Sequence, residues 1–457
     1  MTHSPEQPAP PIAGSGPAPG KADPPGMRQV ATASFIGTVI EFYDFGIYGT
    51  AAALVFPQVF FPALGEAAGT IASFAALGVA FLARPFGSIL FGHYGDRLGR
   101  KKTLIATMLL MGLSTVLVGL MPTANQIGVA APALIIVLRV MQGLAAGGEF
   151  AGAVLFSSEH APKDKRGFWA MFPSLGGGGA IVLANATFFL TSVLMSEETF
   201  VSWGWRVPFL ASFLLVVFGL WVRLRIDETP VFKNQKEQSG TSKMPFAEAF
   251  KHQPLQVLLA TGAATACFAL TYIGGTYLIS YGTSVLDLHG TYVLGIAMIG
   301  GLAISAGVVL GAILSDRFGR RVVMVWSTCA AVVWALALFP ILDLGSRAVF
   351  AIGLPVTMFL SGLGRGPQGA FLSELFHTRY RYTAVGLSYA LAGMIGGGVP
   401  PLVATSIISS LGSFVFGIVL AGTCAVSLIC ILLVGETKQL DLDHTTSTAP
   451  RPDHVSR

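Results

Sequence analysis

The chain alternates between long apolar segments and short polar connections. A bilayer core of about 30 Å is crossed by about 20 apolar residues in a helix. Twelve segments meet this length, so the pattern predicts an all-α integral membrane protein with an even number of spans. We predict the spans at 30–56, 68–93, 103–121, 131–158, 167–195, 206–224, 255–281, 291–314, 322–340, 347–376, 384–408 and 412–434.

Positive charge is concentrated in every second connection. Most of the 28 Lys and Arg residues lie in five stretches, at 95–102, 163–166, 223–251, 315–321 and 379–381. The connections between them carry only Arg206 and Arg347. Because cytoplasmic loops are enriched in Lys and Arg, this alternation predicts a multi-pass protein of the cell (inner or plasma) membrane with both termini in the cytoplasm.

Composition excludes a soluble globule. The chain is 53% hydrophobic and 11% charged, which leaves too little polar surface to cover a water-soluble fold. We attribute the net charge of +5 to cytoplasmic loops that face anionic lipid, and expect no nucleic-acid partner. The four cysteines lie inside apolar spans without ligand-like spacing, so we expect neither a metal site nor a cofactor.

Two sequence patterns occur twice in the same order. DRLGRK at 96–101 recurs as DRFGRR at 316–321, and Ser-Ser-Glu at 157–159 recurs as Leu-Ser-Glu at 372–374. This repetition predicts a duplicated six-span unit, as found in carriers whose halves rock about a central site. The predicted organisation is a cytoplasmic tail at 1–29, halves at 30–224 and 255–435, a cytoplasmic linker at 225–254, and a second tail at 436–457.

Six charged residues lie inside predicted spans. A charge in the bilayer centre is costly, so such residues normally face a cavity or a partner. Two of the spans carry a polar stripe along one helical face. The six are Glu41, Asp44, Arg84, Arg139, Glu149 and Arg365. One stripe consists of Glu41, Asp44 and Tyr48 in the first span. The other consists of Arg139, Gln142 and Glu149 in the fourth span.

The motifs resemble those of a known family. The loop pattern G-x-x-x-D-R-x-G-R-K at 92–101 resembles the signature of the major facilitator superfamily. Further stretches, among them FLARPFGSILFG at 81–92, WGWRVPF at 203–209 and DETPVF at 227–232, resemble the metabolite:proton symporter family. The resemblance implies a twelve-helix fold in two halves and proton-coupled uptake of organic acids, or of zwitterions such as proline and betaine.

Burial raises the pKa of a carboxyl group and a nearby arginine lowers it, so a carboxylate that alternates between these surroundings can carry a proton. No His or Lys lies in a span interior. Asp44 with Arg139 matches the arrangement of related proton-coupled sugar transporters, and Glu41 is the second candidate. For substrate binding we expect Arg84 and Arg365 to grip carboxylates, with Glu149, Gln142, Tyr48, Tyr272 and Tyr277 nearby.

The repeated loop motif predicts a cytoplasmic gate. The resemblance implies that charge clusters between helices hold this side closed in the outward-facing state. The expected members are Asp96, Arg97, Arg100, Asp316, Arg317 and Arg320, completed by the pairs Glu159 with Arg166 and Glu374 with Arg381. The alternative is a set of solvated surface pairs worth at most about 1 kcal/mol each.

Other readings stay open at this point. Proton-coupled uptake of a zwitterionic compatible solute is the main alternative to organic-acid symport, and a membrane nutrient receptor without transport is another. The intramembrane charges could also serve only to fasten helices, and Tyr272 and Tyr277 could be packing residues. An enzyme is not expected, because no nucleophile–base pair or metal cluster is evident. We expect a monomer.

Overall fold

The computed structural model describes residues 27–98, 100–159, 161–225, 253–376, 381–438 and 440. Most of the predicted tails and of the linker at 225–254 lie outside this range. The side chains of residues 92–102 are also outside the described part, so the gate predictions for Asp96, Arg97 and Arg100 fall there.

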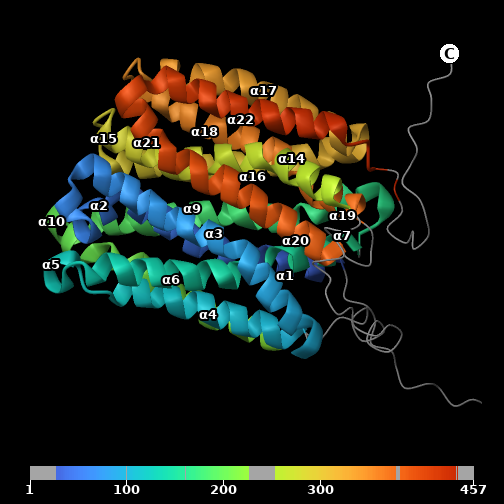
Figure 1. Cartoon of the computed structure of the whole chain (residues 1–457), viewed down its shortest axis with the longest axis horizontal. Coiled ribbons are helices and arrows are strands. Elements are labelled where there is room, and N and C mark those ends of the chain that lie inside the picture. Colours follow the sequence, from blue (N-terminus) through green and yellow to red (C-terminus); the bar gives the residue numbers. More distant parts are fainter. Residues whose placement is uncertain are drawn as a thin grey trace, which may run out of the picture.

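The described chain is helical and has no strand. The first six spans are built from long helices joined by short turns. They are α1 (Met27–Leu54), α3 (Glu66–Leu98), α4 (Arg100–Leu120), α6 (Ala130–Ala146) with α7 (Phe150–Glu159), α8 (Arg166–Ala170) with α9 (Phe172–Leu194), and α11 (Arg206–Arg225). Three short helices, α2 (Phe56–Phe60), α5 (Ala124–Ile127) and α10 (Glu197–Thr199), lie together at one end of the bundle (Figure 1).

The last six spans repeat this plan, with more interruptions. They are α14 (Pro254–Tyr272) with α15 (Leu278–Ser284), α16 (Gly290–Phe318), α17 (Arg320–Leu342), α18 (Arg347–Arg365) with α19 (Gln368–Leu375), α20 (Arg381–Ala392) with α21 (Val399–Leu411), and α22 (Ser413–Leu433). π-Helical turns at Ile273–Tyr277 and Gly393–Gly398 connect α14 to α15 and α20 to α21. Both turns contain consecutive glycines, a pair at 274–275 and a triplet at 396–398.

Every predicted span corresponds to a helix or an interrupted helix. Within the described residues, ten are long and apolar enough to cross a membrane. The helices at 197–204 and 206–221, bent by 48° at the break between them, form an eleventh, and Ile105–Leu120 is a shorter apolar helix. The helices run side by side, with the first-half group (blue to green) beside the second-half group (yellow to red) in Figure 1.

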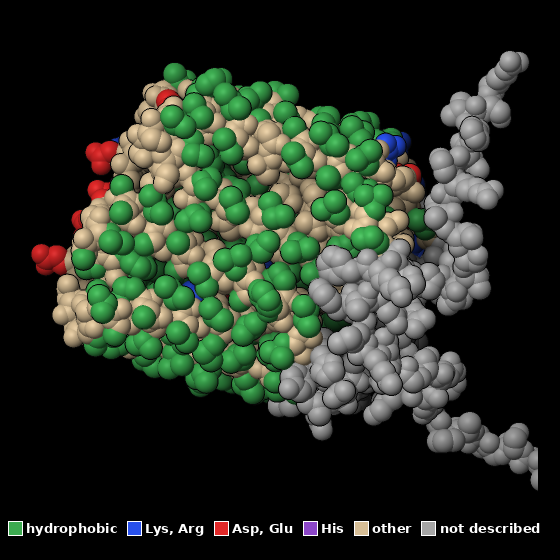
Figure 2. Space-filling model, viewed as in Figure 1, with side chains coloured by type: hydrophobic (Ala, Val, Ile, Leu, Met, Phe, Trp, Pro, Cys, Tyr) green, Lys and Arg blue, Asp and Glu red, His purple; other side chains and the backbone are tan. Residues whose placement is uncertain are grey.

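The outer surface agrees with a membrane environment. Large apolar side chains, such as Leu82, Leu113 and Phe213, are exposed on the sides of the bundle. Acidic side chains gather at one end and basic side chains at the other (Figure 2). We call these the acidic end, where α2, α5, α10 and α15 lie, and the basic end, where α7, α19 and α20 lie (Figure 1).

Equivalent helix pairs cross at the same kind of glycine contact in both halves. A Cβ on Gly143 of α6 would lie 2.1 Å from the Ala80 carbonyl oxygen of α3. A Cβ on Gly362 of α18 would lie 2.2 Å from the Ile304 carbonyl oxygen of α16. Only glycine permits backbones to approach this closely, so the second and fourth spans of each half are packed alike.

Glycines also permit the contact between the halves. A Cβ on Gly178 of α9 would lie 2.2 Å from Ser305 Oγ of α16. On the other side of the molecule, Gly397 of the second π-helical turn packs against Phe81 of α3. The two halves therefore meet along α9 and α16 and along α3 and the α20–α21 span, which leaves the polar stripes between them.

Candidate functional site

The polar stripes of α1 and α6 face each other. Arg139 is fully buried, and its Nη1 donates to Gln142 Oε1 at 2.6 Å. Gln142 Nε2 in turn donates to the Thr115 hydroxyl of α4 at 2.6 Å. Asp44 is close enough to Thr115 and Arg139 to interact with both. The Arg139 guanidinium lies 3.7 Å from the Tyr48 ring centroid. Asp44 and Tyr48 of one stripe and Arg139 and Gln142 of the other are thus brought together.

Arg139 retains donor groups that this network does not use. Its Nε and Nη2 atoms and the Tyr48 hydroxyl find no hydrogen-bond partner among the described residues. The ion pairs between described side chains do not include one between Asp44 and Arg139. Since buried guanidinium groups are normally fully hydrogen-bonded, this arginine has capacity for a further acceptor.

Arg84 lies beside this network, in an aromatic setting. Its guanidinium is 4.1 Å from the Phe45 ring centroid and 4.6 Å from that of Phe81. Its Nε and Nη2 atoms have no partner among the described residues. Arg84 and Glu41 line one narrow cavity, together with Phe150 and others. A buried cation stacked on rings and short of acceptors is suited to an anionic ligand.

Arg365 points toward the same centre from the second half. Its Nη2 donates to the Thr271 hydroxyl at 3.0 Å and to the Cys267 carbonyl at 3.5 Å. Its Nε has no partner in the described part of the chain. The charge of Arg365 acts on Tyr272, as do those of Arg84 and Arg139. Tyr272 therefore lies among all three arginines, at the junction of the halves.

Two polar residues of this centre escaped the sequence interpretation. The Tyr389 ring of α20 stacks on Phe150 of α7, with centroids 3.6 Å apart, and its electrostatic neighbours include Arg84 and Arg365. Gln368 begins α19 just after the break at Pro367, is buried, and lies beside Cys267, as Arg365 does. The Tyr389 hydroxyl and both side-chain polar atoms of Gln368 have no partner among the described residues. A polar residue beside a helix break in an otherwise apolar span was the available signal.

Two other predicted residues lie differently. Tyr277 packs among aromatic side chains, with ring centroids 6.1 Å from Phe74 and 6.0 Å from Phe416. Its surroundings favour packing over contact with the arginines. Glu149 is buried in the break between α6 and α7, where its backbone N–H donates to the Ala146 carbonyl at 3.4 Å. Their predicted roles stay predictions.

The basic end holds a charge cluster that joins the two halves. Arg166 of α8 pairs with Glu374 of α19 at 3.0 Å. Arg320 of α17, which is fully buried, pairs with the same Glu374 at 3.4 Å and with Asp316 at 2.5 Å. The Asp316 carboxylate also accepts hydrogen bonds from the backbone N–H groups of Gly167 and Phe168, both at 2.8 Å. We call these residues the gate cluster.

The pairing in the gate cluster differs from the order along the chain. The repeated sequence pattern suggested Glu159 with Arg166 and Glu374 with Arg381, each within one half. The structure links Arg166 to Glu374, and Arg381 to Glu159 at 3.5 Å, so both pairs cross between halves. Arg317 is not brought into the cluster, because it is exposed and lies over its neighbour Phe318.

A family model described as "Major Facilitator Superfamily" matches residues 34–401. The chain belongs to the major facilitator superfamily. The relatives to which it is similar are named as transporters of metabolites, so the chain is a multi-pass membrane transporter with a small-molecule substrate, and the prediction that it is not an enzyme is confirmed.

Three Escherichia coli K12 relatives illustrate the similarity. The inner membrane metabolite transport protein YhjE is 41% identical, over 91% of this chain and 96% of the relative. The shikimate transporter is 36% identical, over 90% and 95%. The proline/betaine transporter is 31% identical, over 93% and 86%. Their names span organic acids and zwitterions, so they leave the substrate class open.

Solved structures confirm the predicted fold. The proton:xylose symporter XylE, solved with 6-bromo-6-deoxy-D-glucose bound, superposes with a TM-score of 0.72 at 16% identity, over 91% of this chain and 97% of that one. The chain therefore has the twelve-helix major facilitator fold in two six-helix halves.

Proposed function

We propose that this transporter is a proton-coupled symporter of a small organic acid, with one or two carboxylates, which works by alternating access. It acts as a monomer in the inner or plasma membrane. The basic end and both termini face the cytoplasm, as the charge of the loops indicates. No cofactor takes part.

One observation carries the proposal: three buried arginines surround one centre, and each has donor atoms without an acceptor among the described residues. Arg84 and Arg139 each have two such nitrogens, and Arg365 has one. Because leaving a buried charged donor unpaired is costly, a ligand that brings carboxylate oxygens is the best complement. The planar guanidinium fits a carboxylate in bidentate fashion.

The aromatic side chains argue against the zwitterion alternative. Phe and Tyr rings are the usual contacts for a substrate ammonium. Here the guanidinium of Arg84 already lies over Phe45 and that of Arg139 over Tyr48. The Arg365 guanidinium likewise lies 4.9 Å from the Phe268 centroid. A substrate cation would have to displace these arginines and would be repelled by them, which favours an anionic substrate.

Coupling is assigned to the carboxylates of α1. Asp44 interacts with both Arg139 and Glu41. When Asp44 is protonated, the spare donors of Arg139 are available to the substrate. When Asp44 releases its proton, its carboxylate competes for the same arginine and the substrate leaves. Glu41 is the second candidate for the proton, and Gln142 holds Arg139 in place.

The gate cluster gives alternating access a physical switch. Opening of the basic end requires separation of Arg166 from Glu374 and of Glu159 from Arg381, since both pairs join the halves. It also removes Asp316 from the first turn of α8. The cost of this separation favours the closed arrangement until substrate binding stabilises the open one.

Uptake by proteoliposomes tests this function. Labelled mono- and dicarboxylates and labelled betaine are offered with an imposed pH gradient, acidic outside, and with no gradient. We expect accumulation of a carboxylate only with the gradient. Binding without uptake would favour a receptor, gradient-independent equilibration would refute coupling, and accumulation of betaine in preference to acids would replace the proposed substrate class.

A further inference from the structure

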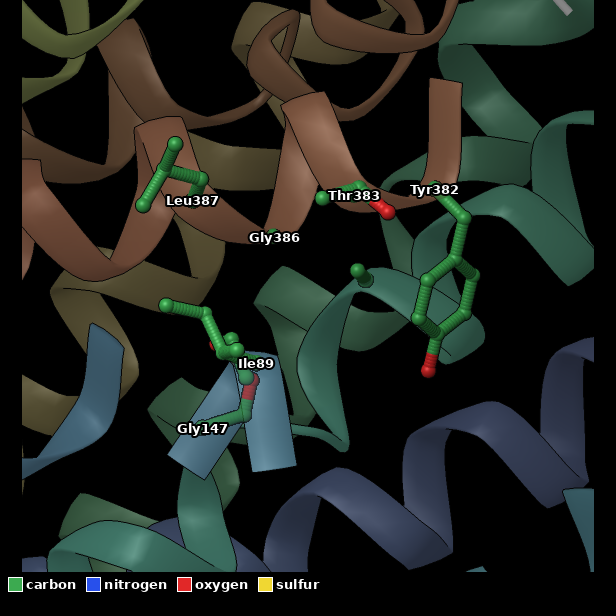
Figure 3. A pocket seen from close by; sticks show the side chains of 8 residues that line it. Ile89, Gly147, Tyr382, Thr383, Gly386 and Leu387 are labelled. Atoms are coloured by element: carbon green, nitrogen blue, oxygen red, sulfur yellow. The ribbon is translucent and has the colours of Figure 1, made fainter. Parts of the chain in front are cut away.

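Two narrow cavities lie next to each other between the central site and the basic end. The inner cavity is lined by Glu41, Arg84 and Tyr389. The outer cavity lies between α3 and α20, where Ser88, Ile89, Tyr382 and Thr383 line it (Figure 3). Three residues, Gly147, Ala151 and Gly386, line both cavities. The two spaces therefore adjoin.

The outer cavity lies near the basic end. Its Ile89 wall is exposed on the apolar side of α3, which faces lipid, so a way out to water lies past Tyr382 and Thr383. Tyr382 and Thr383 belong to the first turn of α20, whose first residue, Arg381, pairs with Glu159 at the basic end. The opening is thus close to the level where the gate cluster closes the substrate route.

The two adjoining cavities are too narrow for a metabolite. The inner cavity has room for about one water molecule and the outer one for one or two. Drug-sized ligands normally require pockets of about 300–1,000 Å³ of well-formed space. Water and protons can pass such a constriction while an organic acid cannot.

The walls of both cavities carry polar groups. At the inner end, Arg84 and the Tyr389 hydroxyl are buried and have donor atoms without a partner among the described residues. At the junction, the Ser88 hydroxyl donates to the Gly147 carbonyl. At the outer end, the Tyr382 hydroxyl donates to the Gly148 carbonyl at 2.7 Å. Gly147, in the break between α6 and α7, thus brings a backbone carbonyl to the junction of the two cavities.

The inner end meets the coupling carboxylates. Groups that face Glu41 come from four elements: Asp44 on α1, Tyr272 on α14 and Tyr389 on α20 interact with it electrostatically, and Arg84 on α3 lines the same cavity. Asp44 and Glu41 lie one helical turn apart, so a proton on one can pass to the other through water or directly.

We propose that protons leave the Asp44–Glu41 pair toward the basic side through this water-wide passage between α3 and α20, apart from the route of the substrate. The proton passes from the Glu41 carboxyl group to water in the passage and then to bulk solvent, and Arg84 balances the carboxylate that remains. This inference rests on the proposed proton coupling and adds where the proton goes.

Filling the passage tests the inference. A Cβ on Gly386 would have only the Ala151 Cβ within 4 Å, at 3.3 Å, so a larger side chain at 386 enters the passage. In proteoliposomes, Gly386→Val is expected to slow pH-driven uptake about tenfold, equivalent to a barrier increase of about 1.4 kcal/mol. Substrate counterflow, which needs no net proton release, should stay within about twofold of the wild-type rate.

Controls separate the passage from the coupling itself. Gly422→Val on α22, where a Cβ meets nothing within 4 Å, should change neither rate. Gly386→Ala fills less of the passage and should slow pH-driven uptake in the same direction but by a smaller factor. It replaces Gly386→Val as the test if the valine variant does not insert into the membrane. Equal effects on uptake and counterflow, or no effect of either variant on uptake, would overturn the passage while wild-type coupling stands. A wild-type protein that exchanges substrate but ignores the pH gradient would overturn coupling and passage together.

Discussion

The central site and the gate cluster are both built from buried arginines and carboxylates, but their hydrogen bonding differs. In the gate cluster, Arg320 is shared between Glu374 and Asp316, and Arg166 binds the same Glu374. In the central site, Arg84 and Arg139 lie over aromatic rings with donors unused by the described residues. Charges that are paired across the halves stabilise one arrangement of them, whereas arginines without a carboxylate partner fit the proposed role of receiving an anionic ligand.

The contrast follows from general electrostatics. A buried ion pair offsets its desolvation cost only when geometry is good and the remaining donors are bonded. The gate cluster comes close to this condition, with ion pairs for every charge and backbone N–H groups on Asp316, and Arg166 Nε is its one buried guanidinium nitrogen without a partner among the described residues. The central arginines do not meet it within the described protein, so their burial is best explained by a ligand and by the carboxylates of α1.

The largest effect is expected at Asp44. Asp44→Asn cannot release a proton, so uphill accumulation driven by a pH gradient should be abolished. Counterflow exchange should remain in part, because it requires no net proton release. Both rates are measured in proteoliposomes, with Glu66→Gln, an exposed acidic residue that begins α3, as the matched control. Undiminished accumulation would eliminate Asp44 as the coupling group.

Arg84→Ala should remove most substrate affinity. Truncation of one partner of a desolvated, charge-assisted pair costs about 2–5 kcal/mol, roughly 30-fold to several thousand-fold in affinity. Arg84→Lys should restore only part of it, because an ammonium lacks the bidentate fork. Binding titrations measure this, with exposed Arg347→Ala at the acidic end as control. Full affinity in Arg84→Ala would remove this arginine from the substrate site.

Glu374→Gln is expected to loosen the gate without destroying the site. It leaves Arg166 and Arg320 buried beside a neutral amide, and breaking a buried pair costs about 3–5 kcal/mol. The population should shift toward an open basic end. Spin labels at Lys163 in the first half and at exposed Arg317 in the second half report this as a longer distance. An unchanged distance distribution, with Glu66→Gln behaving like the wild type, would count against the gating role.

The smallest effect concerns Arg365, which already donates to the Thr271 hydroxyl and the Cys267 carbonyl. If it contacts a second carboxylate, Arg365→Ala should weaken a dicarboxylate about tenfold more than its monocarboxylate analogue, a difference of about 1.4 kcal/mol. Equal losses for both ligands would make Arg365 a structural residue. The comparison is made in one binding assay on the same preparation.

Much of the fold could be predicted from the sequence because each span carries its own signal. Length and hydropathy locate the helices, and the spacing of Asp44 and Tyr48 places them on one face. The interruptions inside spans were less visible: 131–158 appears as one apolar segment, yet the helix breaks at 147–149. Glycine pairs mark such places without revealing which helix will approach them.

The site was predicted in part, for a similar reason. A charged residue inside an apolar span carries a free-energy cost that suggests a function, so Arg84, Arg139 and Arg365 were identified as candidate site residues. Tyr389 and Gln368 were missed because a neutral polar residue in a span costs less than a charge and neither lies on a polar stripe, so the importance of each depends on which helices surround it. The pairing of Arg166 with Glu374 joins the two halves, and no local pattern can specify a contact of that kind.

The central claim is that the buried arginines bind carboxylates. A thermal-shift screen of the purified protein against mono-, di- and tricarboxylates, proline and betaine at two pH values tests it directly, because a ligand stabilises the state it binds in proportion to occupancy. We expect a carboxylate to raise the Tm of the wild type and of Arg347→Ala, and to lose this effect in Arg84→Ala. If betaine or proline gives the largest shift and the shift persists in Arg84→Ala, the account is contradicted.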